Sequence, residues 1–242
     1  MKLKEWTKYF FFLVFLLALF SCNSQNTIKE NAPNIILIMA DDLGYETLGA
    51  NGGTSYETPN LDRMASSGIR FNHCYSQPLC TPSRVKIMTG INNVRNYVKF
   101  GHLDIGQTTF GHLLQEGDYA TAIIGKWQLG KSASGPEHFG FDEHCLWQVT
   151  EGRTDSLGRD TRYSEPALQI NGLLQTLDKN DYGPDMVSQF GMKFMERAVE
   201  KGQPFFLYYP MMLTHCPFSP TPESKDWLIN QDAVLSYVGD SN

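Results

Sequence analysis

This sequence of 242 residues lacks repeats, low-complexity tracts and any apolar run of the roughly 20 residues that span a bilayer. Basic residues are also scarce: 20 Lys and Arg stand against 26 Asp and Glu, giving a formal net charge of −6. Proteins that bind nucleic acid need clustered Lys and Arg to contact phosphates, so we expect no nucleic-acid partner. The length is enough for one sizeable hydrophobic core.

The five cysteines follow no metal-binding pattern. No Cys-x-x-Cys pair and no His-Glu-x-x-His segment occurs, so zinc is not indicated. Four cysteines follow Cys22, and an exported chain could join some of them in disulfides, but their spacing leaves the pairing open. They are Cys74, Cys80, Cys145 and Cys216.

The N-terminus has the features of an export signal. Three lysines precede a short apolar run, residues 10–20, which fits the core of a signal peptide. The "LFSC" that follows resembles the lipobox of bacterial lipoproteins, although an ordinary signal peptide cleaved nearby is the alternative. We expect residues 1–22 to be a lipoprotein signal peptide with Cys22 lipidated, and residues 23–33 to be a flexible tether. The protein would then be exported to the periplasm or cell envelope and anchored by lipid to a bacterial membrane.

Short, continuously apolar runs predict strands that are buried on both faces of a sheet. Residues 34–40 and 204–210 have this pattern, and residues 119–124 form a similar run after a helix closed by glycine. Residues 69–75 alternate between apolar and polar side chains, which predicts a further strand.

Helical periodicity predicts helices over residues 58–68, 83–89 and 185–201. The Gly, Asp, Thr and Ser of residues 130–180 predict an irregular insertion with short elements at best. Helices that alternate with apolar strands indicate an α/β fold, with a mostly parallel mixed sheet flanked by helices on both faces. We expect residues 34–242 to form one such domain.

In sheets of this kind, ligands bind beyond the carboxyl ends of the strands. Asp41, Asp42, Lys126 and His215 each stand at the end of an apolar run, and Cys80 is expected on a short turn between a strand and a helix. The pattern therefore predicts that these five side chains meet at one edge of the sheet.

For each of these candidate residues, chemistry alone leaves both a functional and a structural role open. Adjacent carboxylates at a strand end favour a hard divalent cation, but they also occur in solvated turns. Lys126 suits an anionic group, His215 a proton donor and Arg84 an oxyanion, although each residue type is more often structural or solvated. Cys80 would be a nucleophile only beside an electropositive neighbour, and the Cys-x5-Arg spacing of thiol phosphatases is absent.

Four segments together resemble one family. "PNIILIMADDLGY" resembles the opening strand and metal-binding Asp pair of sulfatases, and "CTPSR" followed by "MTG" resembles their signature. "GKWQLG" resembles their Gly-Lys-Trp-His-Leu-Gly segment, and "THCPF" their later histidine motif. The segments come in the family's order, so the chain is identified as similar to the N-terminal part of the type I, formylglycine-dependent sulfatases of the alkaline-phosphatase-like superfamily.

This resemblance implies a role for Cys80. In such sulfatases a separate formylglycine-generating maturation enzyme reads the short Cys-x-Pro-x-Arg stretch and oxidises the cysteine to an aldehyde. One hydroxyl of the hydrated aldehyde attacks the sulfur of a sulfate ester, and the other later expels sulfate, which splits one difficult step into two easier ones. The implied substrate is a sulfated carbohydrate or an aryl sulfate.

The resemblance also implies a metal site. Asp41, Asp42 and the group derived from Cys80 would ligate Ca²⁺ or Mg²⁺, which lowers the pKa of the attacking hydroxyl and offsets the negative charge of the transferring group.

The remaining residues would act on the substrate. Arg84 would support the aldehyde hydrate, Lys126 would hold the sulfate and His215 would protonate the departing alcohol. Gln128 departs from the family pattern, because many members have histidine there. Glutamine can hydrogen-bond to the substrate but cannot take up a proton near neutral pH, so we expect a polar binding role.

The family has a second metal-ligand pair and a small antiparallel domain well beyond the histidine motif. We expect both to be missing from a truncated chain, which would be weakly active or inactive by itself. Two alternatives stay open: a degenerate, non-catalytic surface lipoprotein, and a phosphoryl hydrolase of the same superfamily. A Ser or Thr in place of Cys80 would favour the hydrolase.

Overall fold

The computed structural model describes residues 32–175 and 177–227. The chain divides into Met1–Ala32 and Pro33–Asn242, and the description below concerns the second unit. The predicted signal peptide, Cys22 and most of the predicted tether lie outside the described residues. Among the helices that are described, none is both long enough and apolar enough to cross a membrane.

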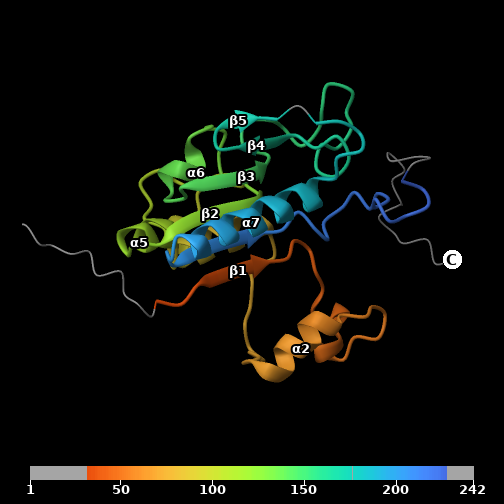
Figure 1. Cartoon of the computed structure of the whole chain (residues 1–242), viewed down its shortest axis with the longest axis horizontal. Helices are drawn as coiled ribbons and strands as arrows, with labels where there is room; N and C mark the ends of the chain where they lie inside the picture. The colour runs from red at the N-terminus through yellow and green to blue at the C-terminus, as the bar shows by residue number, and fades with distance from the viewer. Residues whose placement is uncertain (1–31, 176, 228–242) are drawn as a thin grey trace, which may run out of the picture. The chain divides into compact units, whose positions relative to one another are not determined.

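A six-stranded mixed sheet lies at the centre of the described unit (Figure 1). Its strand order is β1-β6-β2-β3-β4-β5, in which the first four are parallel and the last two are antiparallel to their neighbours. The predicted mostly parallel sheet is therefore confirmed. The strands are β1 (Ile35–Met39), β2 (Ala120–Lys126), β3 (Glu143–Trp147), β4 (Leu168–Ile170), β5 (Leu173–Leu174) and β6 (Phe205–Pro210).

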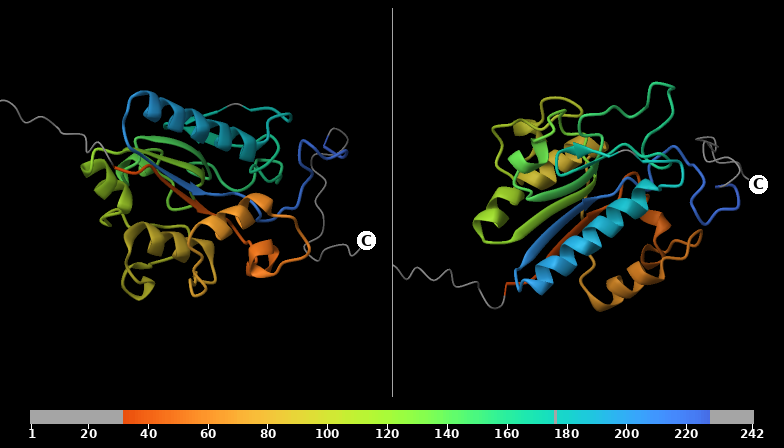
Figure 2. Two further views of the ribbon diagram at one scale, coloured as in Figure 1. Left: turned by 60° about the horizontal axis from the view of Figure 1, so that its bottom comes forward. Right: turned by 45° about the horizontal axis from the view of Figure 1, so that its top comes forward.

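Helices cover both faces of the sheet, as predicted. The longest described helix, α7, crosses one face over β2 and β6, and α3 and α5 pack on the other (Figures 1 and 2). The helices are α2 (Pro59–Ser67), α3 (Cys80–Thr89), α4 (Asn93–Asn96), α5 (Phe110–Glu116), α6 (Gly135–His138) and α7 (Gly183–Glu200), with short 3-10 turns η1 (Tyr45–Thr47) and η2 (Gly49–Asn51).

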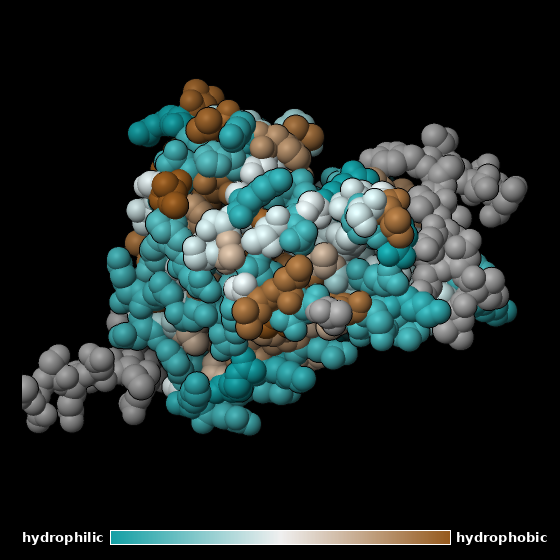
Figure 3. Space-filling view, turned by 90° about the horizontal axis from the view of Figure 1, so that it is seen from above, coloured by the Kyte–Doolittle hydropathy of each residue, from teal (hydrophilic) through white to brown (hydrophobic). Residues whose placement is uncertain are grey.

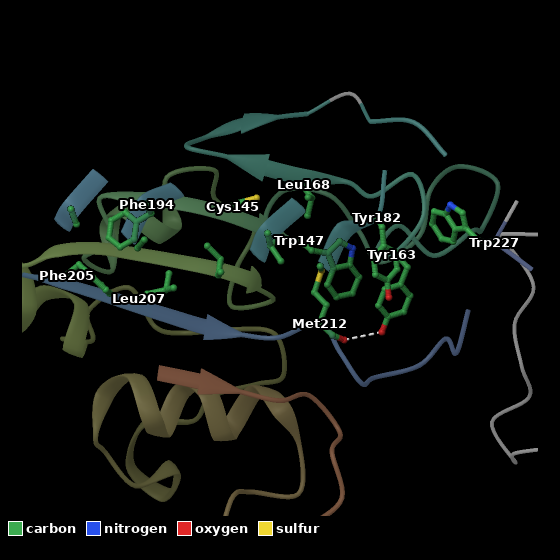
Figure 4. Close-up of a cluster of buried hydrophobic side chains, with 14 residues drawn as sticks. Cys145, Trp147, Tyr163, Leu168, Tyr182, Phe194, Phe205, Leu207, Met212 and Trp227 are labelled. Atoms are coloured by element: carbon green, nitrogen blue, oxygen red, sulfur yellow. Dashed lines mark hydrogen bonds between the residues drawn. The ribbon is translucent and has the colours of Figure 1, made fainter. Parts of the chain in front are cut away.

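Successive side chains of β6 supply two separate cores, because neighbouring residues of a strand point to opposite faces of the sheet. Phe205 and Leu207 pack beneath α7 with Phe194 (Figure 4). Phe206 and Tyr208 pack on the other face against α3 and α5. The two cores fix β6 between β1 and β2, and so fix the strand ends that carry the candidate site. On the face seen in Figure 3, hydrophobic residues form separate patches among hydrophilic ones.

The prediction that the first strand is buried on both faces is wrong. Ile36 and Ile38 are 50 % and 56 % exposed, whereas Ile35 and Leu37 pack against the α3 side. In the described part of the chain β1 pairs only with β6, and α7 lies over β2 and β6 rather than over β1.

One other expectation from the sequence is wrong. Residues 69–75 form no strand, and Ile69 and Phe71 are exposed, because alternation alone does not make a strand without a neighbour to pair with. Residues 130–180 contain short elements within irregular chain, as expected, but one of them, β3, is the buried fourth strand of the parallel set, which the sequence did not indicate. Its fully buried His144 is polar and interrupts the apolar run, so the strand could not be recognised from apolar residues alone.

Candidate active site

The carboxyl ends of β1, β6 and β2 meet at one edge of the sheet. Beyond the strands, the amide of Asp41 donates to the carbonyl of Leu213 at 2.9 Å, and the amide of Thr214 donates to the carbonyl of Asp41 at 2.8 Å. These bonds hold the segment after β1 beside the segment after β6. The acidic pair and His215 are therefore brought to the edge where Lys126 ends β2.

Cys80 is the first residue of helix α3, not part of a turn before a helix that begins near Ser83, and it does not follow a strand within the described residues. Ser83 stabilises this start, because its hydroxyl donates to the carbonyl of Leu79 at 2.9 Å and accepts from the amide of Gln77 at 3.0 Å. The first turn of a helix presents free backbone N–H groups and a partial positive charge, which favours anions near Cys80.

Lys126 and Asp41 form a buried ion pair, with 2.6 Å between Nζ and Oδ2 and only 2 % and 6 % of the side chains exposed. The same ammonium lies 3.4 Å from Sγ of Cys80. Lys126 thus connects the acidic pair to the start of α3. A buried charge is tolerated when a partner compensates it, and Asp41 provides that partner.

Arg84 joins α3 to the loop that follows β2. Its guanidinium is buried, donates to the backbone carbonyl of Trp127, and donates through Nη2 to Oε1 of Gln128 at 3.0 Å. The same amide oxygen is 3.5 Å from the Cys80 thiol. Arg84 contacts Cys80 itself only through the backbone, with 3.3 Å between Nε and the carbonyl oxygen. It therefore orients Gln128 and the first turn of the helix.

Gly125 allows the end of β2 to approach β6. Its φ of 102° lies in the left-handed region, and a Cβ there would meet the carbonyl oxygen of Pro210. Since other residues rarely adopt this conformation, glycine is required directly before Lys126.

His215 and Asp42 form a second, more open pair. Nε2 of His215 is 3.4 Å from Oδ2 of Asp42, and Asp42 is 54 % exposed. The predicted site residues thus fall into two groups, a buried cluster and the more open Asp42–His215 pair, which the Asp41–Asp42 peptide bond joins. The buried cluster consists of the buried Asp41, Arg84 and Lys126 and the partly buried Cys80 and Gln128.

Tyr163 supports this second pair and was not foreseen from the sequence. Its single hydroxyl hydrogen is shared between the carbonyl oxygen of Met212, at 3.2 Å (Figure 4), and that of His215. Burial raises the pKa of this hydroxyl, so it stays protonated and can donate. A contact between residues 52 positions apart leaves no local signal in the sequence.

The ligand atoms at this edge are of the type that binds a hard divalent cation, but they are too few to complete its coordination. Asp41 and Asp42 offer carboxylate oxygens, whereas Ca²⁺ takes about six to eight oxygens. Within residues 32–175 and 177–227, no group of three or more His, Cys, Asp or Glu side chains could hold a metal ion. The two aspartates would therefore form part of a site at most. The free thiols of Cys74, Cys145 and Cys216 do not contribute to such a group.

Comparison with known proteins gives a consistent result. The family model described as Sulfatase matches residues 33–229. Arylsulfatase G of Rattus norvegicus is 34 % identical over 223 residues, covering 78 % of this chain and 42 % of that protein. N-acetylglucosamine-6-O-sulfatase of Bacteroides thetaiotaomicron is 31 % identical over 217 residues, covering 85 % of this chain and 35 % of the relative.

A solved structure of a protein in complex with its substrate D-glucosamine-2-N,6-O-disulfate superimposes with a TM-score of 0.67 at 32 % identity. The match covers 79 % of this chain and 36 % of the other. The chain thus spans less than half the length of the relatives it matches. With a family model that matches most of its length and a fold shared with these relatives, the chain belongs to the sulfatase family, whose fold is alkaline-phosphatase-like.

Proposed function

We propose that this chain carries the catalytic residues of a sulfuric ester hydrolase that acts on a sulfated carbohydrate or an aryl sulfate through formylglycine made from Cys80. The observation that carries the proposal is the contact of Cys80 with Lys126, which Asp41 holds in place. The names of the relatives, which include an arylsulfatase and an N-acetylglucosamine-6-O-sulfatase, support these two substrate classes.

Three features of the buried cluster suit a sulfate group. The Lys126 ammonium beside position 80 would bind a sulfate oxygen, and the first turn of α3 adds backbone N–H donors. Because Arg84 engages Oε1 of Gln128, the amide nitrogen of Gln128 is free to donate to the substrate. The cluster would thus hold the anion beside the residue that reacts.

His215 is placed to protonate the leaving alcohol. Its imidazole is partly exposed, as a group that meets a substrate oxygen must be, and Asp42 lies 3.4 Å away. The carboxylate would orient the ring towards the departing oxygen. Without the proton, a sugar alkoxide would be a poor leaving group.

Two groups that the family resemblance implies, formylglycine and a divalent cation, would act together with these residues. A hydrated aldehyde at position 80 would supply one hydroxyl to attack sulfur and a second whose deprotonation expels sulfate. Asp41 and Asp42 would supply part of the ligand set of a Ca²⁺ or Mg²⁺ ion, which would add positive charge near the transferring group. Lys126 contacts Oδ2 of Asp41, so the Asp41 carboxylate would serve both the ammonium and the ion.

The proposal also includes the location of the protein. Cys22 would be lipidated and would tether the exported chain to a bacterial membrane, where it would meet extracellular glycans. Metabolic labelling with a fatty-acid analogue tests this, because Cys22→Ala should abolish the label while the exposed Cys74→Ala should leave it unchanged.

Co-expression with a formylglycine-generating enzyme tests the chemistry. Mass spectrometry of the peptide that contains Cys80 should show the aldehyde. The matured chain, in which Asp41 and Asp42 supply only part of a metal site, should release sulfate only slowly from an aryl sulfate or from a sulfated glucosamine. Cys80→Ser, which cannot be matured by this route, should not sustain turnover. Aldehyde without sulfate release would favour the non-catalytic lipoprotein. Release of phosphate from a phosphate ester by the thiol form would favour the phosphoryl hydrolase.

A further inference from the structure

Arg162 is a buried cation outside the cluster described above. It lies between β3 and β4, is 1 % exposed, and its Nε and Nη1 atoms have no hydrogen-bond partner. Its ion pair with Asp160 is long, with 3.4 Å between Nε and Oδ1. A buried guanidinium with unused donors is costly, because it has lost water without gaining full compensation from the protein.

Asp160 cannot compensate Arg162 fully, since it serves two arginines. Oδ2 of Asp160 accepts from Nε of Arg153 at 3.1 Å, and Oδ1 accepts from the backbone amide of Arg162 at 3.0 Å. One carboxylate therefore faces two guanidinium groups, whereas the neighbouring Arg159 is paired with two carboxylates, those of Asp155 and Glu165. The charges of this segment balance, but the Nε and Nη1 donors of Arg162 stay unsatisfied, and an anion could accept from them.

Trp147 places this cation next to the candidate active site. The guanidinium lies 4.4 Å from the centroid of the Trp147 ring. Trp147 ends β3 and pairs in register with Lys126 at the end of β2. Paired residues of neighbouring strands are about 5 Å apart, so Trp147 is the neighbour of Lys126 at this edge of the sheet, on the side away from β6. The Trp147 ring packs beneath α7, whereas the Lys126 ammonium reaches the start of α3.

Tyr163 makes a second, independent connection. It follows Arg162 directly, its ring is 5.6 Å from the guanidinium, and its hydroxyl donates to the carbonyl of His215. Figure 4 shows Trp147, Tyr163 and Met212 lying together at the end of the sheet. Arg162 is thus connected to both Lys126 and His215 through one intervening residue each.

We propose that Arg162 binds a second oxyanion, a sulfate or a carboxylate, on the substrate whose sulfate ester is hydrolysed at the candidate active site. This inference rests on the proposed function and narrows its substrate class to ligands with at least two anionic groups. The planar guanidinium can bind such a group with two parallel hydrogen bonds, and stacking on Trp147 keeps the donor edge in place. Movement of the exposed loop 151–159, which contacts Arg162 through Asp160, would admit the anion.

The test compares ligands with one and two anionic groups. The full chain, expressed without the maturation enzyme so that no ligand is consumed, is titrated calorimetrically with glucosamine-6-O-sulfate, glucosamine-2-N,6-O-disulfate and a 6-O-sulfated glucosamine linked to a uronic acid. We expect the wild type to prefer at least one ligand with a second anion by about tenfold, as charged hydrogen bonds allow. The disulfate and uronate arms distinguish sulfate from carboxylate.

Arg162→Gln should remove the preference without weakening the binding of the monosulfate. Arg153→Gln is the matched control, because Arg153 also pairs with Asp160 but is 54 % exposed, and it should keep the preference. Equal binding of all three ligands by the wild type, or a preference that survives Arg162→Gln, would overturn the inference.

Two further variants decide the question if near-UV circular dichroism shows that Arg162→Gln is unfolded. Arg162→Lys keeps the positive charge but loses the two parallel N–H donors, so it should reduce the preference for ligands with a second anion. Asp160→Asn removes the carboxylate that pairs with the guanidinium, so it should increase this preference. No change in either variant would contradict the inference. Sulfate release from the monosulfate by the matured chain is measured separately. If that release is absent while the Arg162-dependent preference persists, the proposed catalysis fails and the second anion site stands.

Discussion

Lys126 and Asp41 lie 85 residues apart in the sequence, yet Nζ and Oδ2 are 2.6 Å apart in a buried ion pair. The pair joins the ends of β2 and β1 across β6, and it carries the lysine that contacts Cys80. It therefore contributes both to the stability of the sheet edge and to the geometry of the candidate active site.

Removing one member of this pair should be strongly destabilising. Lys126→Met leaves the Asp41 carboxylate buried without its partner, and we expect the free energy of unfolding to fall by about 3 to 5 kcal/mol. The double variant Asp41→Asn, Lys126→Met should recover much of this loss, because it leaves no uncompensated charge. Urea denaturation in the presence of a chelator measures both. Additive losses in the double variant would show that the two side chains are not coupled.

His144 should make the stability of the fold depend on pH. Burial lowers the pKa of this histidine from 6.5 to about 4, so below pH 6.5 the unfolded chain takes up a proton that the folded chain rejects. The free energy of unfolding should fall as the pH drops from 6.5 to about 4, by about 3 kcal/mol in total, and this contribution should be constant above pH 6.5.

Denaturation of wild type and His144→Gln between pH 4 and 8 isolates the effect. Glutamine is neutral throughout, and its side-chain oxygen can accept from Gly172 as Nε2 of His144 does. The stability difference between the two proteins should therefore change with pH. The exposed His73→Gln is the control, and an equal slope in all three proteins would exclude His144 as the source.

The described cysteines should differ in reactivity towards an alkylating reagent. Cys74 is exposed and should be modified first, whereas Cys145 is buried and its pKa is raised by burial from 9.0 to about 12. Since the thiolate is the reactive form, Cys145 should stay unmodified until the chain unfolds. Peptide mass spectrometry after iodoacetamide treatment at pH 8 measures the order. Early labelling of Cys145 would mean that β3 is not buried beneath α7.

Tyr163→Phe should loosen the segment that carries His215. The change leaves two carbonyl groups, those of Met212 and His215, without a donor, and should cost about 1 to 3 kcal/mol. Hydrogen exchange should accelerate around residues 211–216. Tyr45→Phe, at an exposed position, is the matched control and should change neither stability nor exchange. Unchanged exchange in Tyr163→Phe would assign Tyr163 no role at the site.

Much of the sheet could be predicted because three of its four parallel strands are apolar runs that end in polar residues. That pattern placed Asp41, Lys126 and His215 at one edge, and the structure brings them there. β3 could not be found in the same way, since its buried His144 and partly exposed Glu143 break the apolar run. The partial exposure of β1 depends on which strand lies beside it, which no local pattern specifies.

The contacts within the site were beyond the reach of sequence reasoning. The motif suggested Arg84 as a partner of the group at position 80, but its donors engage the backbone of Trp127 and the side chain of Gln128. Such bonds depend on how α3 is docked on the sheet. The position of Arg162 likewise depends on a loop whose path follows from tertiary contacts with Trp147 and Tyr163.

The half-exposed isoleucines of β1 have a practical consequence for work with this polypeptide. Ile36 and Ile38 lie on a strand that, in the described part of the chain, has a neighbour on one side only. An exposed apolar edge strand with unpaired backbone N–H and C=O groups can pair with the same strand of another molecule. At high concentration the protein should therefore associate and scatter more light. Ligand titrations are therefore best performed at low protein concentration, with the hydrodynamic radius monitored throughout.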